Sequence, residues 1–321
     1  MKGYDEFKKE LQKEVKKRLY DDREVRIRRI NKLNEGEKEV ISIMESDDIK
    51  TFCSDCFLDG IFEEYQKGMP LEEIAAALVR ENNKEQVGNY AMEAAKRICL
   101  DDLDDVENVK ERLYFRMINT DRNTELLEDM PHFDYFDLSM VFYLMMDRGD
   151  SGLLSMRITD RMLREWGITK EYLRETAMEN TERILPGKRA WLEDVLEDYM
   201  EDADTLTEEI KEFREQKDNE KPVSLMVATN ETGVNGFGVI FYPEYLKKTA
   251  EILNDNLYIL PSSIHEALLY PEGEGCESGE MLRMVRAVNK ECVASDDYLS
   301  DHVYYYDRAA DRIEMITEQE G

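Results

Sequence analysis

The first element that the hydrophobic pattern predicts is an amphipathic helix near the N-terminus. Apolar side chains recur there at four-residue spacing, at Phe7, Leu11, Val15 and Leu19. In an α-helix this spacing places the apolar side chains in one stripe along a polar rod. We therefore expect residues 2–20 to form a helix that buries this stripe.

A β-hairpin and a second helix are predicted next. Apolar and β-branched residues gather at 25–27 and 40–44, and residues 34–37 between them contain Asn34 and Gly36, which are typical of turns. Pro70 suits the first turn of a helix. We expect that helix to extend to residue 80 and to pack against the core.

The middle of the chain favours strands mixed with short helices. Apolar runs predict strands at 113–118, 138–146 and 153–158, with a brief helix at 125–128. Asp160 and Thr169 are placed to cap two further helices, and the second ends before residues 186–187, which are Pro and Gly.

The C-terminal third alternates strand-like and helix-like segments. Strands are predicted at 224–229, 237–242, 258–260 and 265–270, helices at 243–253 and 280–292, and a closing hairpin at 303–306 and 312–316. Because hairpins and helices are interspersed without a regular βαβ repeat, we predict a mixed α+β fold.

A strongly acidic segment separates two regions of this pattern. Residues 191–213 have helical spacing of apolar residues, and nine acids and no base lie between residues 190 and 211. The polar stretch 215–222 ends in Pro222 and reads as a linker. We therefore predict an N-terminal α+β region (1–190), an acidic helix and linker (191–221), and a smaller C-terminal α+β unit (222–321).

The composition narrows the classes of partner. The chain of 321 residues has 43 Lys and Arg against 73 Asp and Glu, for a net charge of −30, while 42% hydrophobic residues support a folded core. A polyanion repels nucleic acids and anionic lipids. We expect no direct nucleic-acid binding and no membrane association, and we consider a basic protein the best-matched partner. No feature of the sequence specifies an oligomeric state.

The cellular compartment follows from the N-terminus and the cysteines. Residues 2–20 are charged and lack the apolar core of a signal peptide, and the longest apolar run, 140–146, is too short to cross a bilayer. Five cysteines, an odd number, do not form a disulfide framework. We therefore expect a cytoplasmic protein.

Short sequence blocks resemble those of a known family. The most specific is LYILPSSIHE at 257–266, and others lie at 226–230, 234–236 and 242–243. Further matching blocks occur at 62–65 with Gly68, 118–119 with Asn123, 126–127, 131–132, 137–138 and 180–181. Together they resemble an uncharacterised family known only as a domain of unknown function and common in anaerobic gut bacteria. The resemblance covers nearly the whole chain except 191–221 and 272–279. It implies a shared fold and brings no established activity.

The block at 261–266 also holds the best candidates for catalysis, namely Ser262, Ser263, His265 and Glu266. A hydroxyl, an imidazole and a carboxylate are the groups of nucleophilic catalysis. In a strand, same-face neighbours two apart are about 6–7 Å apart, beyond hydrogen-bond reach. The alternative is a strand end whose polar side chains bond to the backbone and fix a turn.

Metal and cofactor motifs are incomplete. Cys53 and Cys56 have the spacing of half a zinc site, but no second pair follows, and the chain has three histidines. The glycines at 233, 236 and 238 match neither a dinucleotide fingerprint nor a P-loop. We predict no metal and no cofactor.

Three functional hypotheses follow. The leading one is a non-catalytic cytoplasmic interaction protein with an acidic surface. The first alternative is a hydrolase that uses Ser262 or Ser263 with His265. The second is a nucleic-acid mimic that presents the acidic helix to a basic groove on a partner. The candidate partner-binding residues on that helix are Glu193, Asp194, Glu197, Asp198, Glu201 and Asp202.

Overall fold

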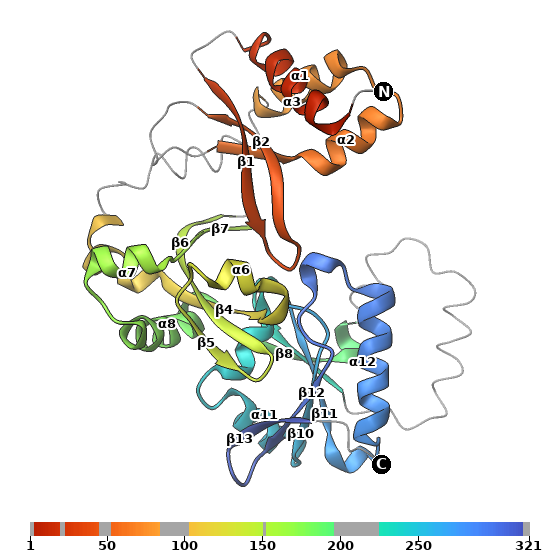
Figure 1. Cartoon of the computed structure of the whole chain (residues 1–321). Helices are drawn as coiled ribbons and strands as arrows, with labels where there is room; N and C mark the ends of the chain where they lie inside the picture. Colours follow the sequence, from red (N-terminus) through yellow and green to blue (C-terminus); the bar gives the residue numbers. More distant parts are fainter. Residues whose placement is uncertain are drawn as a thin grey trace.

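The computed structural model of the protein describes residues 3–19, 23–44, 53–83, 103–149, 152–195 and 225–316 (Figure 1). Helices are interspersed there with three antiparallel sheets. The fold class is therefore α+β, as the hydrophobic pattern predicted. Within these ranges no helix combines the length and the apolar character that a bilayer crossing requires.

The N-terminal unit, residues 3–83, has its own core. Its elements are α1 (Tyr4–Lys16), β1 (Glu24–Lys32), β2 (Gly36–Met44), β3 (Cys53–Phe57), α2 (Leu58–Gln66) and α3 (Leu71–Asn83). The strands form a sheet in the order β1-β2-β3, and the helices lie together at its end in Figure 1. Phe7, Leu11 and Val15 of α1 are fully buried against Ile41 and Leu58, as predicted, whereas Leu19 lies beyond the end of α1 at Lys16 and is only partly buried.

The body, residues 103–316, begins with a four-stranded central sheet. Its strands are β4 (Leu113–Asn119), β5 (His132–Tyr135), β6 (Leu138–Gly149) and β7 (Gly152–Arg157). β6 is the central strand and pairs with the other three. Short helical segments precede and follow β4, namely α5 (Val106–Val109), η2 (Lys110–Arg112), η3 (Asp121–Asn123) and α6 (Thr124–Leu127), and β7 leads to α7 (Asp160–Trp166) and α8 (Lys170–Ile184).

The body also contains a six-stranded sheet in the order β13-β12-β10-β11-β9-β8. Its strands are β8 (Gly187–Trp191), β9 (Met226–Asn230), β10 (Leu257–Pro261), β11 (Ala267–Pro271), β12 (Val303–Asp307) and β13 (Arg312–Ile316). The helical segments among them are η4 (Gly236–Phe241), α11 (Tyr245–Leu253), η5 (Glu272–Glu274), α12 (Ser278–Cys292) and η6 (Ser295–Asp297).

One continuous hydrophobic core joins the two sheets of the body. Phe115 and Phe142 of the central sheet pack in the same cluster as Phe237, Leu257 and Ile259 from the C-terminal part of the chain. The division of the chain into separate units at residues 190 and 222 stays a prediction. β8 and β9 pair with each other on either side of the acidic segment.

Several predicted elements differ from the structure. The apolar run 237–242 is not a strand but the 3₁₀ helix η4, and residues 236–240 are buried on all sides. A short run that is apolar throughout has no periodicity that could distinguish a strand from a helix. α7 is capped by Thr159, whose hydroxyl accepts the N–H of Met162, and Asp160 is its first helical residue. The polar strand β8 was not predicted.

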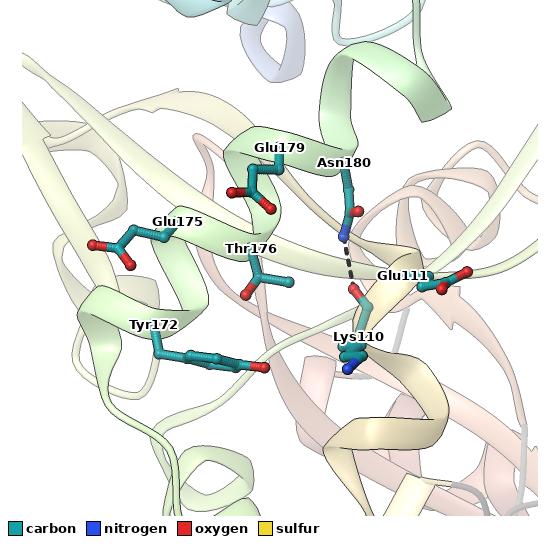
Figure 2. Close-up of a pocket in the computed structure, with 7 residues that line it drawn as sticks. All are labelled: Lys110, Glu111, Tyr172, Glu175, Thr176, Glu179 and Asn180. Atoms are coloured by element: carbon teal, nitrogen blue, oxygen red, sulfur yellow. Dashed lines mark hydrogen bonds between the residues drawn. The ribbon is translucent and has the colours of Figure 1, made fainter.

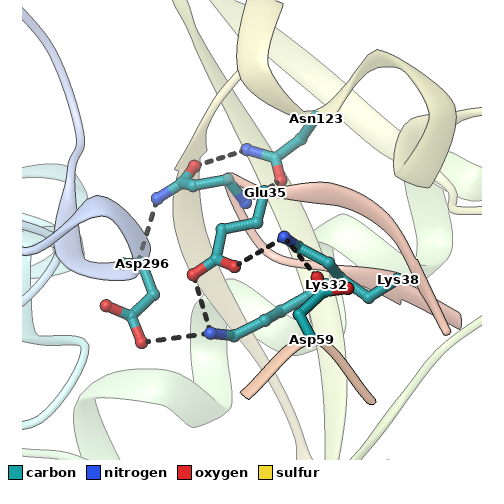
Figure 3. Close-up of polar contacts among 7 residues, drawn as sticks. Lys32, Glu35, Lys38, Asp59, Asn123 and Asp296 are labelled. Carbon is teal, nitrogen blue, oxygen red and sulfur yellow. Dashed lines mark hydrogen bonds and ion pairs between the residues drawn. The ribbon is translucent and has the colours of Figure 1, made fainter. Parts of the chain in front are cut away.

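The tip of the β1–β2 hairpin connects the N-terminal unit to the body (Figure 3). Asn34 donates both amide hydrogens to body carbonyls, those of Asp296 (3.0 Å) and Tyr298 (2.7 Å). The ammonium of Lys32 lies 2.7 Å from Glu35 and 3.7 Å from Asp296. The hydrogen bond to Glu35 is the main cause of the raised pKa of Lys32. The tip is therefore held by both amide and charged contacts.

Candidate functional site

The four candidate catalytic residues lie together in the turn between β10 and β11. β10 ends at Pro261 and β11 begins at Ala267, and these two residues pair directly across the hairpin. The predicted strand at 265–270 therefore starts two residues later than expected. His265 and Glu266 lie in the turn and not on a strand face.

Both ring nitrogens of His265 have partners. Its Nδ1 accepts the backbone N–H of Asn235 (3.1 Å), so the proton of the neutral ring lies on Nε2. Nε2 then donates to Asp297 Oδ1 at 2.9 Å. This orientation of the imidazole connects three segments of the body: the β10–β11 turn, the start of η4, and η6.

The other candidate side chains bond within the turn. Ser263 Oγ accepts the backbone N–H of His265 (3.0 Å), and Ser262 Oγ donates to Glu266 Oε1 (3.3 Å). Among the residues that the structure describes, neither serine hydroxyl bonds to the imidazole. The turn thus gathers the four residues, and their hydrogen bonds stabilise it. Asp297, the partner of His265, was missed because it lies 32 residues further along the chain.

The close packing of Gly236 explains why the family block at 234–236 lies against the turn between β10 and β11. A Cβ at this position would clash with Thr229 Oγ1 and lie 2.5 Å from the carbonyl oxygen of His265. Thr229 Oγ1 itself donates to that carbonyl at 2.8 Å. Asn235 has a φ of 51°, in the left-handed region that Asn tolerates. This close approach aims the N–H of Asn235 at His265.

A second histidine is oriented by a carboxylate on the body. His302 Nδ1 lies 3.2 Å from Asp137 Oδ2, and the hydroxyl of Tyr304 donates to Asp137 Oδ1 at 2.6 Å. Burial raises the pKa of Tyr304, and Asp137 adds to this effect. Sequence reasoning missed the pair because Asp137 and His302 are 165 residues apart. The contact orients the imidazole, with about a third of its side chain exposed.

A groove lies beside α8 (Figure 2). It has a volume of about 340 Å³. We call it the α8 groove, and it is lined by Lys110, Glu111, Tyr172, Glu175, Thr176, Glu179 and Asn180.

Helical spacing builds one wall of the α8 groove. Tyr172, Glu175, Thr176 and Glu179 are three or four residues apart on α8, so they share one face of the helix. Asn180 fixes the opposite wall, because its side-chain amide donates to the carbonyls of Lys110 (2.7 Å) and Leu113 (3.1 Å).

The α8 groove is acidic. Within the described residues, the carboxylates of Glu111, Glu175 and Glu179 form no ion pair or side-chain hydrogen bond. Lys110 pairs instead with Glu107 at 2.6 Å, which raises the pKa of the lysine. The ring of Tyr172 is 37% exposed at the same place. The groove therefore presents three carboxylates and an aromatic face.

The acidic segment is described only at its start. Glu193 and Asp194 follow β8 and are exposed. The other four candidate partner-binding residues, Glu197, Asp198, Glu201 and Asp202, lie outside the described residues.

The two cysteines of the sequence motif lie in one strand. Cys53 and Cys56 are in β3, paired in register with Met44 and Ile41 of β2. In the described part of the chain, no group of three or more His, Cys, Asp or Glu side chains is placed to hold a metal ion.

Comparison with known proteins identifies a family. A family model described as a family of unknown function, DUF5688, matches residues 4–308. The chain belongs to this family. The match extends through the N-terminal unit and almost to the end of the body. No curated protein and no solved structure matches the chain.

The sequence blocks that suggested this family supply many of the polar contacts described above. Asn119 Nδ2 donates to the carbonyl of Leu299 (2.9 Å), and Asn180 holds the segment before β4. Thr181 Oγ1 accepts the N–H of Phe115 at 3.1 Å. These family blocks therefore join segments that are distant in the sequence.

Proposed function

We propose that this protein is a non-catalytic interaction protein that binds a basic segment of a partner protein, and that the α8 groove is the docking site. The observation that carries this proposal is that one groove is lined by an exposed tyrosine and by three carboxylates that have no ion pair among the described residues. A Lys or Arg side chain complements both features, because a cation is attracted to carboxylates and to an aromatic face.

The charge of the whole chain supports this choice of partner. A net charge of −30 attracts a basic partner from a distance and repels acidic ones. Glu193 and Asp194 are further exposed carboxylates on the body. Cytoplasmic location belongs to the same proposal and is supported by the odd number of cysteines in the sequence.

The test is a titration of the full-length protein with a fluorescent lysine- and arginine-rich peptide, followed by anisotropy at low and at high salt. We expect saturable binding that weakens as salt rises. The double variant Glu175→Gln with Glu179→Gln removes two groove charges and should weaken binding roughly tenfold.

The matched control changes the same charge elsewhere. Glu251 and Glu291 are exposed on α11 and α12, outside the groove, and Glu251→Gln with Glu291→Gln should change the affinity less than about twofold. An equal loss in both double variants would mean that net charge alone attracts the peptide, and the groove would be rejected as the docking site.

A further inference from the structure

Arg116 is a cation on the body that has no carboxylate partner among the described residues. It lies on β4, and its guanidinium Nη2 donates to the hydroxyls of Tyr114 and of Ser155, the latter at 2.7 Å. The guanidinium also stacks on the ring of Tyr143, 4.1 Å from its centroid. Ser155 is on β7, so the side chain of Arg116 reaches across the central strand β6.

One donor of this guanidinium is unsatisfied. The Nε atom of Arg116 is buried and has no hydrogen-bond partner in the described part of the chain. No carboxylate among the described residues forms an ion pair with this arginine. An unpaired buried donor is costly, and more so on a charged group. In a chain with a net charge of −30, a half-buried arginine without an acidic neighbour points to an anionic ligand.

A second arginine lies on the same face of the sheet. Arg157 pairs in register with Tyr143, and Ser155 pairs with Met145, so both point to the face that carries Tyr143. Same-face neighbours along a strand are about 6–7 Å apart. Since the guanidinium of Arg116 already contacts Ser155, both arginines flank the same part of β7. Arg157 is exposed and has no ion pair within the described residues.

We infer that Arg116, Arg157 and Ser155 form a binding site for a phosphate group. The two guanidinium groups supply positive charge and planar pairs of N–H donors, which suit phosphate oxygens. The hydroxyl of Ser155 accepts from Arg116 and lies at the same place, while the hydroxyl of the fully buried Tyr114 holds the guanidinium in position. A phosphate offers more acceptor oxygens and more charge than a carboxylate, so it satisfies more of these donors. This site is separate from the α8 groove and does not depend on the proposed function.

The test uses inorganic phosphate and the full-length protein. Thermal unfolding is measured as phosphate replaces chloride at constant ionic strength. We expect the unfolding temperature to rise with phosphate concentration, because a ligand that binds the native state stabilises it by mass action. Titration with ³¹P NMR should show saturable broadening of the phosphate signal.

Two variants test the named residues. Arg157→Ala changes an exposed side chain, so the fold is retained, and phosphate affinity should fall at least roughly tenfold. Arg164→Ala removes an exposed charge from α7 and should leave the phosphate response unchanged. Arg116→Lys keeps the positive charge and loses the planar pair of N–H donors. The difference in unfolding temperature between phosphate and chloride should therefore shrink strongly.

Three results would overturn the inference. The first is an equal unfolding temperature in phosphate and in chloride for the unmodified protein. The second is an equal response of Arg157→Ala and Arg164→Ala to phosphate. The third is an equal stabilisation by acetate, which would show that the site does not select phosphate.

Discussion

Asn34 and Asn123, which are 89 residues apart in the sequence, form a reciprocal pair of hydrogen bonds. The backbone N–H of Asn34 donates to Asn123 Oδ1 at 2.8 Å, and Asn123 Nδ2 donates to Asn34 Oδ1 at 2.8 Å. Asn34 is 7% exposed and Asn123 is 3% exposed. The pair joins the tip of the β1–β2 hairpin to the segment after β4.

We expect Asn123→Ala to weaken this connection. The substitution leaves a buried N–H and a buried amide oxygen of Asn34 without partners, which costs about 1–3 kcal/mol. Urea unfolding monitored by circular dichroism measures the loss. Asn31→Ala is the control, since within the described residues the partly exposed Asn31 side chain makes only a long hydrogen bond of 3.4 Å to the carbonyl of Glu125. An equal cost for both substitutions would contradict the role of the reciprocal pair.

His265→Ala tests the turn between β10 and β11. It removes the acceptor of the Asn235 N–H and the donor to Asp297, and we expect a loss of about 1–3 kcal/mol in the free energy of unfolding. NMR of the unmodified protein should show the neutral ring protonated at Nε2. A ring protonated at Nδ1 would contradict the contact with Asn235. The hydrolase hypothesis stays a prediction, and an activity lost in both His265→Ala and Ser263→Ala would support it.

The same substitution at two glycines should have opposite effects. Gly236→Ala places a Cβ against Thr229 and the carbonyl of His265, so we expect a loss of about 3 kcal/mol. Gly60 is inside α2 with open space around its Cβ position, and Gly60→Ala should stabilise the helix by up to about 1 kcal/mol. Thermal unfolding of both variants checks the two signs. A neutral Gly236→Ala would show that the turn can move.

Buried tyrosines should make the protein less stable at high pH. Burial raises the pKa of Tyr245 and of Tyr298 to about 12, whereas an unfolded tyrosine titrates near 10. The native state therefore holds these protons more tightly, and this contribution is complete below pH 10 and is lost as pH rises to about 12.

Urea unfolding across this pH range measures the effect, and tyrosinate absorbance reports the titration. Tyr245→Phe keeps the ring and removes the hydroxyl that donates to the carbonyl of Lys188 at 2.7 Å. We expect the free energy of unfolding of this variant to fall less between pH 10 and 12, by about 1–2 kcal/mol. An unchanged slope would show that Tyr245 is not responsible.

Local sequence patterns predicted most of the regular elements. Phe7, Leu11 and Val15 of α1 are all buried, and the apolar run at 138–146 is the central strand β6. Helix periodicity and strand continuity depend on neighbours in the sequence, so a reading of the chain detects them. The family resemblance was likewise carried by short local blocks, and the family match confirms it.

Patterns failed where burial was uniform or the segment was polar. Residues 236–240 are buried on every side in η4, so no alternation or helical stripe marks them. β8 contains Lys188 and Arg189, and it is a strand because β9 pairs with it along five residues. In both segments the packing of other elements decides the conformation.

The sequence by itself determined the α+β class, most helices and strands, the family and the acidic net charge. The tertiary structure alone decided which polar groups meet. His265 pairs with Asp297, Arg116 reaches Ser155, and the wall of the α8 groove faces residues 110–111. The physical reason is the range of the interactions. Periodicity and net charge can be read along the chain. Hydrogen bonds form over about 3 Å, between segments that strand register and core packing bring together.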